Sequence, residues 1–282
     1  MIRVNIDQKV LKKVYKRREP WSHKGDFGKL LIIGGSNDYP GSPGLVAMSA
    51  LRSGCDSARI MAPRRSADIC ASFSPEIMST PLGNELGTAD FDGIKAMSEW
   101  STAVSLGNGL GVSSEKKELV NMLAEKIKKK MVIDADALKM LNKENLNRGI
   151  LITPNSNEFE VLFGIKLSTS LDERAKAAES MAREYGTTIL LKGHVDVISD
   201  GNETFINKVN SIYMTKAGTG DTLAGICAGL VAQKNQIVDS ACAAAFINGY
   251  SGKTAARYKK ESLSVMDIVN EIGSTITKFR SS

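Results

Sequence analysis

Ala217-Gly218-Thr219-Gly220-Asp221, followed at once by Thr222-Leu223-Ala224-Gly225-Ile226, places two glycines and a carboxylate where an apolar helix pattern begins. Glycines let backbone N–H groups converge on an anion, and a helix N-terminus adds a positive dipole. A carboxylate at that point can accept a proton from a hydroxyl beside a phosphate. The stretch therefore predicts a phosphate-handling site with its own base. It also suits an ordinary turn and helix start, in which Asp221 only complements the dipole.

The composition is that of a globular, weakly basic chain. Its 282 residues are 42% hydrophobic and carry 37 basic against 31 acidic side chains, a net charge of +6. No linker or repeat divides the sequence, so we expect one domain over residues 1–282. A basic balance suits anionic ligands such as nucleotides. The basic clusters at 12–18 and 126–130 belong to predicted helices, so no nucleic-acid partner is expected.

Several classes of site are excluded by what the chain lacks. The four cysteines are far apart without a CxxC pair, and Cys227 and Cys242 sit in apolar helix patterns typical of core thiols. With only two histidines, His23 and His194, the sequence offers little for a zinc site or a Ser-His-Asp relay. We assign no metal ligand. No signal peptide opens the chain and no apolar run approaches about 18 residues, which predicts a cytoplasmic protein without a membrane partner.

Short apolar strands alternate with helices along the sequence. Strands are predicted at 30–33, 57–61, 102–106, 131–133, 150–153 and 188–191, with a hairpin over 195–199 and 203–206. Helices are predicted at 4–18, 45–52, 115–129, 171–184, 222–233, 237–256 and 265–280. The region from about 62 to 87 is expected to be mostly loop, with a possible short strand at 75–78. This order predicts an α/β fold whose mainly parallel sheet is covered by helices on both faces, with a small antiparallel edge at the hairpin.

Polar and glycine-rich residues follow the predicted strands at their carboxyl ends. In open parallel sheets ligands bind at that edge. Any one of these segments could be ordinary turn chemistry, but together they suit a ligand larger than a sugar. Neither a GxGxxG nor a Walker motif is present. The segments are Gly34-Gly35-Ser36, Gly107-Asn108-Gly109-Leu110-Gly111, Asp134, Pro154-Asn155 and Lys192-Gly193. Lys192 could contact a phosphate there, or it could be a snorkelling surface lysine.

A set of motifs in order along residues 20–260 resembles the ribokinase-like NAD(P)H-hydrate dehydratases. The specific part is His23-Lys24-Gly25-Asp26-Phe27-Gly28, whereas Gly218-Thr219-Gly220-Asp221 is typical of the wider ribokinase-like superfamily. The resemblance implies a ribokinase-like three-layer α/β/α sandwich. The other matching stretches are Leu31-Ile32-Ile33-Gly34-Gly35-Ser36, Ala50-Leu51-Arg52-Ser53-Gly54, Pro75-Glu76-Ile77-Met78, Gly107-Asn108-Gly109-Leu110-Gly111, Ile133-Asp134-Ala135-Asp136-Ala137-Leu138, Thr153-Pro154 and Leu191-Lys192-Gly193.

That family returns hydrated NADH or NADPH to the normal cofactor at the expense of ADP or ATP, with Mg²⁺. Hydroxide is a poor leaving group and phosphate is a good one, so phosphorylating the hydrate hydroxyl makes dehydration possible. The resemblance implies that Asp221 is the base that takes the hydroxyl proton. The alternative within the same fold is a small-molecule kinase that phosphorylates an alcohol of a vitamin or a sugar.

The resemblance also implies two groups of binding residues. The hydrated cofactor, NADHX or NADPHX, would contact Gly41, Ser42, Gly111, Asn155 and Asp221. Asp134 and Asp136 are either structural, one of them capping the following helix, or able to assist a magnesium ion. The adenine nucleotide would contact Lys192, Gly193, His194, Val195, Asp196, Gly218, Thr219 and Gly220.

One departure from the family pattern concerns Asn155, which stands where the family usually has histidine. Asparagine can hydrogen-bond but cannot carry a positive charge near neutral pH. The companion epimerase domain of the family is not expected in this chain, so a separate epimerase would interconvert the hydrate epimers. The apolar C-terminal helices predict a homo-oligomer.

Overall fold

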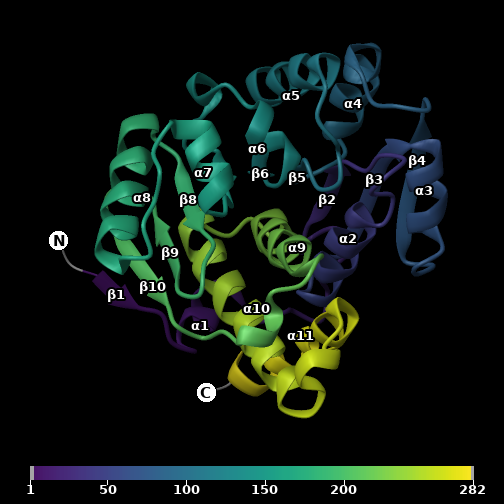
Figure 1. The fold of residues 1–282 in the computed structure, drawn as a ribbon. Coiled ribbons are helices and arrows are strands. Elements are labelled where there is room, and N and C mark those ends of the chain that lie inside the picture. Colours follow the sequence, from purple (N-terminus) through teal and green to yellow (C-terminus); the bar gives the residue numbers. More distant parts are fainter. Residues whose placement is uncertain (1–2, 281–282) are drawn as a thin grey trace.

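The computed structural model describes residues 3–280 and contains one ten-stranded sheet, in the order β1-β10-β9-β8-β7-β6-β5-β2-β3-β4 (Figure 1). Neighbouring strands are parallel except in the two pairs that involve β9, so β9 alone runs against the others. The predicted sheet type and hairpin are confirmed. The strands are β1 (Arg3–Asn5), β2 (Lys29–Ile33), β3 (Ser57–Pro63), β4 (Ile77–Leu82), β5 (Ala103–Leu106), β6 (Lys130–Ile133), β7 (Ile150–Ile152), β8 (Thr188–Leu191), β9 (Asp196–Ser199) and β10 (Thr204–Asn207).

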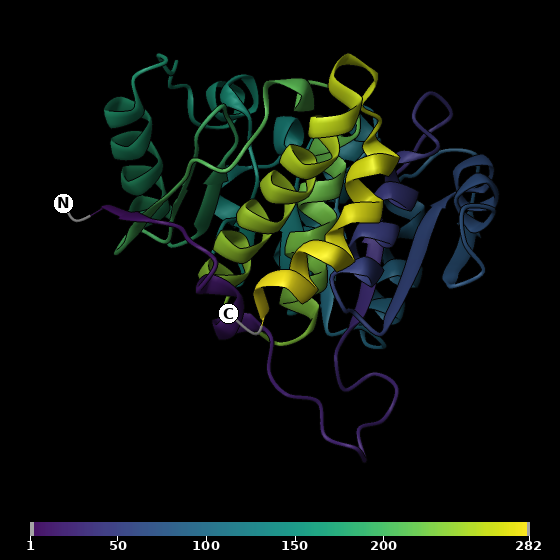
Figure 2. The ribbon, with the colours of Figure 1, turned by 90° about the horizontal axis from the view of Figure 1, so that it is seen from below.

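Helices cover both faces of the sheet, which makes three layers (Figures 1 and 2). One face packs against α1, α2, α3, α9, α10 and α11, and the other against α4 to α8. The α-helices are α1 (Val10–Val14), α2 (Ser42–Arg52), α3 (Arg64–Ala71), α4 (Phe91–Ser98), α5 (Ser114–Lys126), α6 (Asp136–Met140), α7 (Ser156–Phe163), α8 (Leu171–Tyr185), α9 (Thr219–Ala232), α10 (Ile237–Lys259) and α11 (Val265–Arg280).

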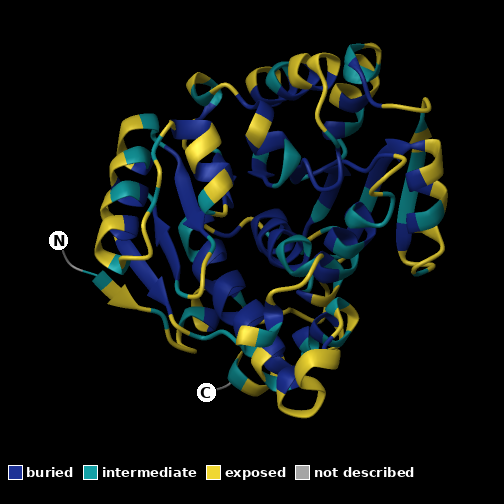
Figure 3. Ribbon diagram, viewed as in Figure 1, coloured by how far each residue is buried: buried dark blue, intermediate teal, exposed yellow. Residues whose placement is uncertain are grey.

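Between the edge strands β1 and β4, the strands of the sheet are nearly continuous apolar runs because both of their faces are buried. In β2, Leu30 and Ile32 belong to the core under α2 and α9, while Leu31 and Ile33 belong to the core under α4 to α8. Figure 3 shows the same pattern, with buried strands between helices whose outer surfaces are exposed. Cys227 and Cys242 are buried free thiols, as the sequence predicts.

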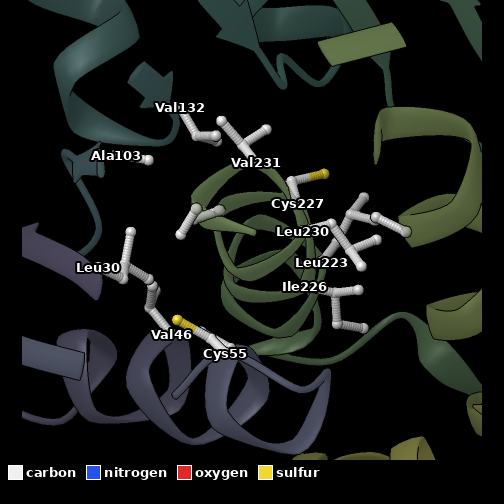
Figure 4. Packing of buried hydrophobic residues seen from close by; sticks show 14 of the residues in the cluster. Leu30, Val46, Cys55, Ala103, Val132, Leu223, Ile226, Cys227, Leu230 and Val231 are labelled. Carbon is white, nitrogen blue, oxygen red and sulfur yellow. The ribbon is translucent and has the colours of Figure 1, made fainter. Parts of the chain in front are cut away.

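Helix α9 is buried almost all round, and its position sets the site. Its apolar side chains, including Leu223, Ile226 and Leu230, pack between the sheet and α2 (Figure 4). Two glycines make the close approach to α2 possible. A Cβ on Gly225 would lie 2.5 Å from the Val46 carbonyl oxygen, and a Cβ on Gly229 would lie 2.8 Å from the Cα of Ala50. The small residues of this helix therefore fix the place of its N-terminus.

Several predicted elements are wrong in extent. The helix expected over 4–18 is instead strand β1, which pairs with β10, and the short α1, because only Leu11 and Val14 bury an apolar face. The region expected to be loop holds α3 and the full strand β4. The basic run at 126–130 is not a last helical turn, since α5 ends at Lys126 and Lys130 opens β6. Helices α4, α6 and α7 were not predicted, because patterns of eight residues or fewer are ambiguous.

Among residues 3–280, no helix combines the length and the apolar character that a membrane crossing requires.

Candidate functional site

The amino end of α9 lies at the carboxyl edge of the sheet, among the loops that follow β2, β5, β6 and β8. Gly218 precedes the helix with φ 90°, a left-handed conformation that favours glycine. No side chain of residues 3–280 caps this end. The Thr219 amide donates to the Lys216 carbonyl at 3.3 Å, so the amides of Gly220 and Asp221 are the ones that remain available to an anion. Asp221 stands in the first turn. The helix predicted to start at Thr222 thus begins three residues earlier and includes Thr219, Gly220 and Asp221.

Asp221 is tied to the end of β5 and, through it, to the end of β6. The Asn108 Nδ2 donates to Asp221 Oδ1 at 2.8 Å and to Asp134 Oδ2 at 2.9 Å. Asn108 and Asp134 are each only 1% exposed. One buried amide group thus bridges two carboxylates that come from different segments of the chain.

Asp134 is the centre of a larger network. Its Oδ1 accepts from Thr153 Oγ1 at 2.8 Å and from Lys192 Nζ at 2.7 Å. Asp136 has a different partner, since its carboxylate accepts a hydrogen bond from the Gly111 amide at 2.9 Å. Neither carboxylate caps α6, whose N-cap residue is Ala135. The helix-capping alternative for these aspartates is therefore wrong.

Lys192 lies in the crevice and is not a snorkelling surface lysine. Its Nζ also lies 3.6 Å from Glu158 Oε2, and a Cβ built on Gly220 would be 3.5 Å from it. Burial alone would lower the Lys192 pKa, but the negative charges of Asp134 and Glu158 outweigh burial and raise it above its usual value. Lys192 is therefore a fixed cation beside the N-terminus of α9.

The surroundings of Asp221 raise the pKa of its carboxyl group toward neutral pH. Burial raises its pKa to about 6, and the charge of Asp134 acts in the same direction. Hydrogen bonds from Asn108 and Ser42 and the charge of Lys192 oppose the increase. A carboxylate with such a pKa is a stronger base than an exposed aspartate, yet it remains ionised at neutral pH.

A cavity of about 280 Å³ opens beside this network. Six of the eight residues predicted to contact nucleotide line it, whereas Gly218 lies just before the helix and Val195 packs on the apolar core. Asn248 and Gly249 of α10 close the floor with Asn210 and Ser211. The predicted residues that line the cavity are Lys192, Gly193, His194, Asp196, Thr219 and Gly220.

Asp196 shapes the cavity wall. It is buried, and its Oδ1 accepts from the Gly193 amide at 3.0 Å while Oδ2 accepts from Asn207 Nδ2 at 3.0 Å. Burial raises its pKa, although these hydrogen bonds oppose the shift. Arg174 supports the same turn by donating to the Lys192 carbonyl at 2.9 Å. The geometry makes Asp196 the anchor of the Gly193 turn.

The residues predicted to contact the hydrated cofactor are only partly brought together. Ser42 opens α2 and hydrogen-bonds to Asp221. Gly41, just before it, lines a separate apolar cavity of about 390 Å³ with Phe73 and Met266. Gly111 uses its amide for Asp136, as described above.

Asn155 is exposed and caps α7. Its Oδ1 accepts from the Glu158 amide at 2.9 Å, and Glu158 Oε2 accepts from the Asn155 amide at 2.8 Å. This is a capping box, and asparagine is among the best residues for it. The substitution by asparagine thus has a structural role of its own.

Two members of the network, Asn108 and Glu158, were not predicted as site residues. The glycine-rich segment around Asn108 predicts close approach of backbone to a ligand and carries no signal for the Asn108 side chain. Glu158 could have been found, because Asn-x-x-Glu after a strand is a capping-box pattern that places the glutamate in the first helical turn.

The run of residues 23–28 lies at the opposite end of the sheet, before β2. Asp56 Oδ2 accepts from the amides of Gly25 at 2.9 Å and Phe27 at 3.0 Å, and Asp26 accepts from the His23 amide at 2.7 Å. The segment between α1 and β2 that carries the run projects from the body of the molecule (Figure 2). Within one copy of the chain, this run is no part of the site around Asp221.

Comparisons with known proteins agree with this architecture. A family model described as NAD(P)H-hydrate dehydratase matches residues 30–274. The bifunctional NAD(P)H-hydrate repair enzyme Nnr of Pyrobaculum aerophilum is 38% identical over 261 residues, which are 92% of this chain and 52% of that protein. The chain thus spans about half the length of the bifunctional relatives it matches. The ADP-dependent (S)-NAD(P)H-hydrate dehydratase of Nitrosopumilus maritimus is 33% identical over 284 residues, 99% of each chain.

A solved structure shares the fold. The ADP/ATP-dependent NAD(P)H-hydrate dehydratase from Bacillus subtilis, co-crystallized with ATP/Mg²⁺, superposes with a TM-score of 0.84 at 22% identity and covers 99% of this chain and 100% of that one. Phosphofructokinase-2 from Escherichia coli superposes with a TM-score of 0.63, which is consistent with the ribokinase-like architecture. From the family model and the relatives with more than 30% identity, the chain belongs to the NAD(P)H-hydrate dehydratase family.

Proposed function

We propose that this protein dehydrates the S-hydrate of NADH or NADPH by transferring a phosphoryl group to the hydrate hydroxyl. The observation that carries the proposal is the placement of Asp221, whose carboxylate stands in the first turn of α9 beside available amides and the fixed cation of Lys192. A base, an anion-binding helix end and a cation at one point are what phosphoryl transfer to a hydroxyl needs. Family membership supplies the substrate class.

The reaction proceeds in two stages at this point. The hydroxyl oxygen bonds to the terminal phosphorus while the bond from that phosphorus to the bridging oxygen of the nucleotide breaks, and Asp221 takes the hydroxyl proton. The amides of Gly220 and Asp221 and the Lys192 ammonium stabilise the charge on the transferring oxygens. The ring nitrogen then donates its lone pair, the carbon–oxygen bond breaks with its electrons to phosphate, and loss of a proton from the neighbouring ring carbon restores the double bond.

We place the adenine nucleotide in the cavity lined by Lys192, Gly193, Thr219 and Gly220, with its terminal phosphate at the start of α9. Relatives that this chain covers almost completely are named ADP-dependent, which favours ADP as the donor, with AMP as the product. Among residues 3–280, no cluster of three or more His, Cys, Asp or Glu side chains is suited to a metal ion. Magnesium would therefore be held mainly by the phosphates of the nucleotide. After Asp134, Glu158 is the carboxylate nearest to the Lys192 ammonium.

The test is an assay with chemically hydrated NADH, Mg²⁺ and either ADP or ATP. We expect the absorbance of the reduced nicotinamide ring to return, with free phosphate released in equal amount. A stable phosphate ester that accumulates without this recovery would instead indicate the kinase alternative. No reaction with either nucleotide would contradict the proposed dehydratase function.

Two further expectations concern partners. We propose that the chain acts on the S epimer alone, so that about half of a racemic hydrate remains until a separate epimerase is added. We also propose a homo-oligomer, which the exposed aromatic side chains of Trp21 and Tyr258 support. Sedimentation velocity tests the second expectation, and a monomer at micromolar concentration would contradict it.

A further inference from the structure

Asn108 has no part in the reaction scheme above, yet both hydrogens of its side-chain amide are used at the site. One hydrogen bond runs to Asp221 and the other to Asp134, at 2.8 and 2.9 Å. The two carboxylates would otherwise face each other without a donor between them. A neutral group with two donors is suited to this place, because it satisfies both carboxylates and adds no charge.

The orientation of the Asn108 amide is fixed by these partners. Its Oδ1 is buried and has no hydrogen-bond partner among residues 3–280. The reversed amide would bring that oxygen against two carboxylates, which is repulsive. Asn108 thus keeps both donors on the carboxylates while its buried oxygen has no partner among the described residues. An unpaired buried acceptor lowers the stability of the fold.

The backbone around Asn108 is equally constrained. Its carbonyl oxygen accepts from the Gly35 amide at 2.9 Å. A Cβ on Gly34 would come within 2.4 Å of that oxygen, and a Cβ on Gly107 within 2.1 Å of the Asp134 carbonyl oxygen. These two glycines let β2, β5 and β6 approach one another at their carboxyl ends. The amide of Asn108 is therefore held rigidly against Asp221.

We propose that Asn108 is a positioning residue that orients Asp221 for proton abstraction and separates it from the charge of Asp134. The role of Asp221 as the base rests on the proposed function, whereas its contact with Asn108 does not. A donor to the ionised carboxyl favours the charged form, so the Asn108 hydrogen bond lowers the Asp221 pKa. Without the Asn108 amide, the charged form of Asp221 loses this hydrogen bond, and the Asp221 pKa is expected to rise.

The test is a ¹³C NMR titration of the aspartate carboxyl carbons in the full chain without ligand. The Asp221 resonance is assigned as the signal that Asp221→Asn removes. We expect Asn108→Leu to raise the Asp221 pKa from about 6 by about one pH unit. An unchanged titration would overturn the proposal.

Thr153→Val is the matched control, because it removes a different hydrogen bond to Asp134 and leaves the Asn108–Asp221 contact in place. An equal shift in this variant would also overturn the proposal. If Asn108→Leu does not fold, Asn108→Asp serves instead and should raise the Asp221 pKa at least as far, since it adds a third carboxylate. In an active preparation, the acid limb of kcat should move with the NMR value while the KM for nucleotide stays constant. The titration stands even if the dehydratase assay fails, so the two proposals can fail separately.

Discussion

At the carboxyl end of the sheet, Asn108 and Asp134 are buried and bonded to Asp221, whose pKa is raised by its burial. At the amino end of β2, residues 23–28 form a partly exposed turn in which the acceptor, Asp56, bonds mainly to backbone amides. The two ends are separated by the length of β2, about 17 Å for five residues. Both ends carry family motifs, but only the carboxyl end of the sheet holds charged groups whose burial costs folding free energy. The comparison suggests chemistry at one end and local folding at the other.

The largest expected effect comes from Asp221→Asn. Loss of a positioned base should lower kcat by about a hundredfold or more, while nucleotide binding is largely kept because the amides of α9 and Lys192 remain. Steady-state kinetics and calorimetric titration with ADP measure the two quantities. Unchanged turnover would refute the role of Asp221 and remove the chemical difference between the ends.

Lys192→Met should be the next largest. The change removes the cation beside Gly220, so the KM for nucleotide should rise by about tenfold or more, while the KM for the hydrate changes less. Lys176→Met is the control, since that lysine pairs with Asp172 on the surface of α8. An equal rise in both variants would mean that overall charge, not the site, attracts the nucleotide.

A third prediction concerns stability at the same end. The Asp221 pKa is raised above its unfolded value, so ionisation of this group opposes folding. The penalty is absent below about pH 4, grows as the pH rises to about 6, and is then constant. Asp221→Asn should therefore stabilise the protein by about 3 kcal/mol at pH 7 and by much less at pH 4. Urea unfolding at the two pH values measures this difference, and a pH-independent effect would contradict it.

The sequence predicted the parts of this comparison that depend on local pattern. The buried strands are short apolar runs, and Asp221 and Lys192 follow them at predictable places. The bridge through Asn108 could not be predicted, because it joins residues 26 and 113 positions away and depends on how β2, β5 and β6 converge. The helix predicted over 4–18 was wrong. Its basic residues have helical spacing, but residues 4–18 bury little apolar surface.

The smallest expected effect is that of a substitution at the amino end of β2, and it tests whether residues 23–28 have a structural role alone. Asp56→Ala removes the acceptor of the Gly25 and Phe27 amides and of Arg18, which contacts it at 3.3 Å. We expect a loss of about 1 to 2 kcal/mol in the free energy of unfolding. Asp68→Ala, an exposed change on α3, is the control and should cost little.

The kcat of Asp56→Ala should match that of the unchanged protein, because the turn lies a full strand away from Asp221. The measurement is urea unfolding together with kcat on the same preparations. A fall in kcat without a loss of stability would contradict a purely structural role for residues 23–28. In that case the projecting segment would have to reach the site of another copy of the chain, and the two ends of the sheet would meet across an interface.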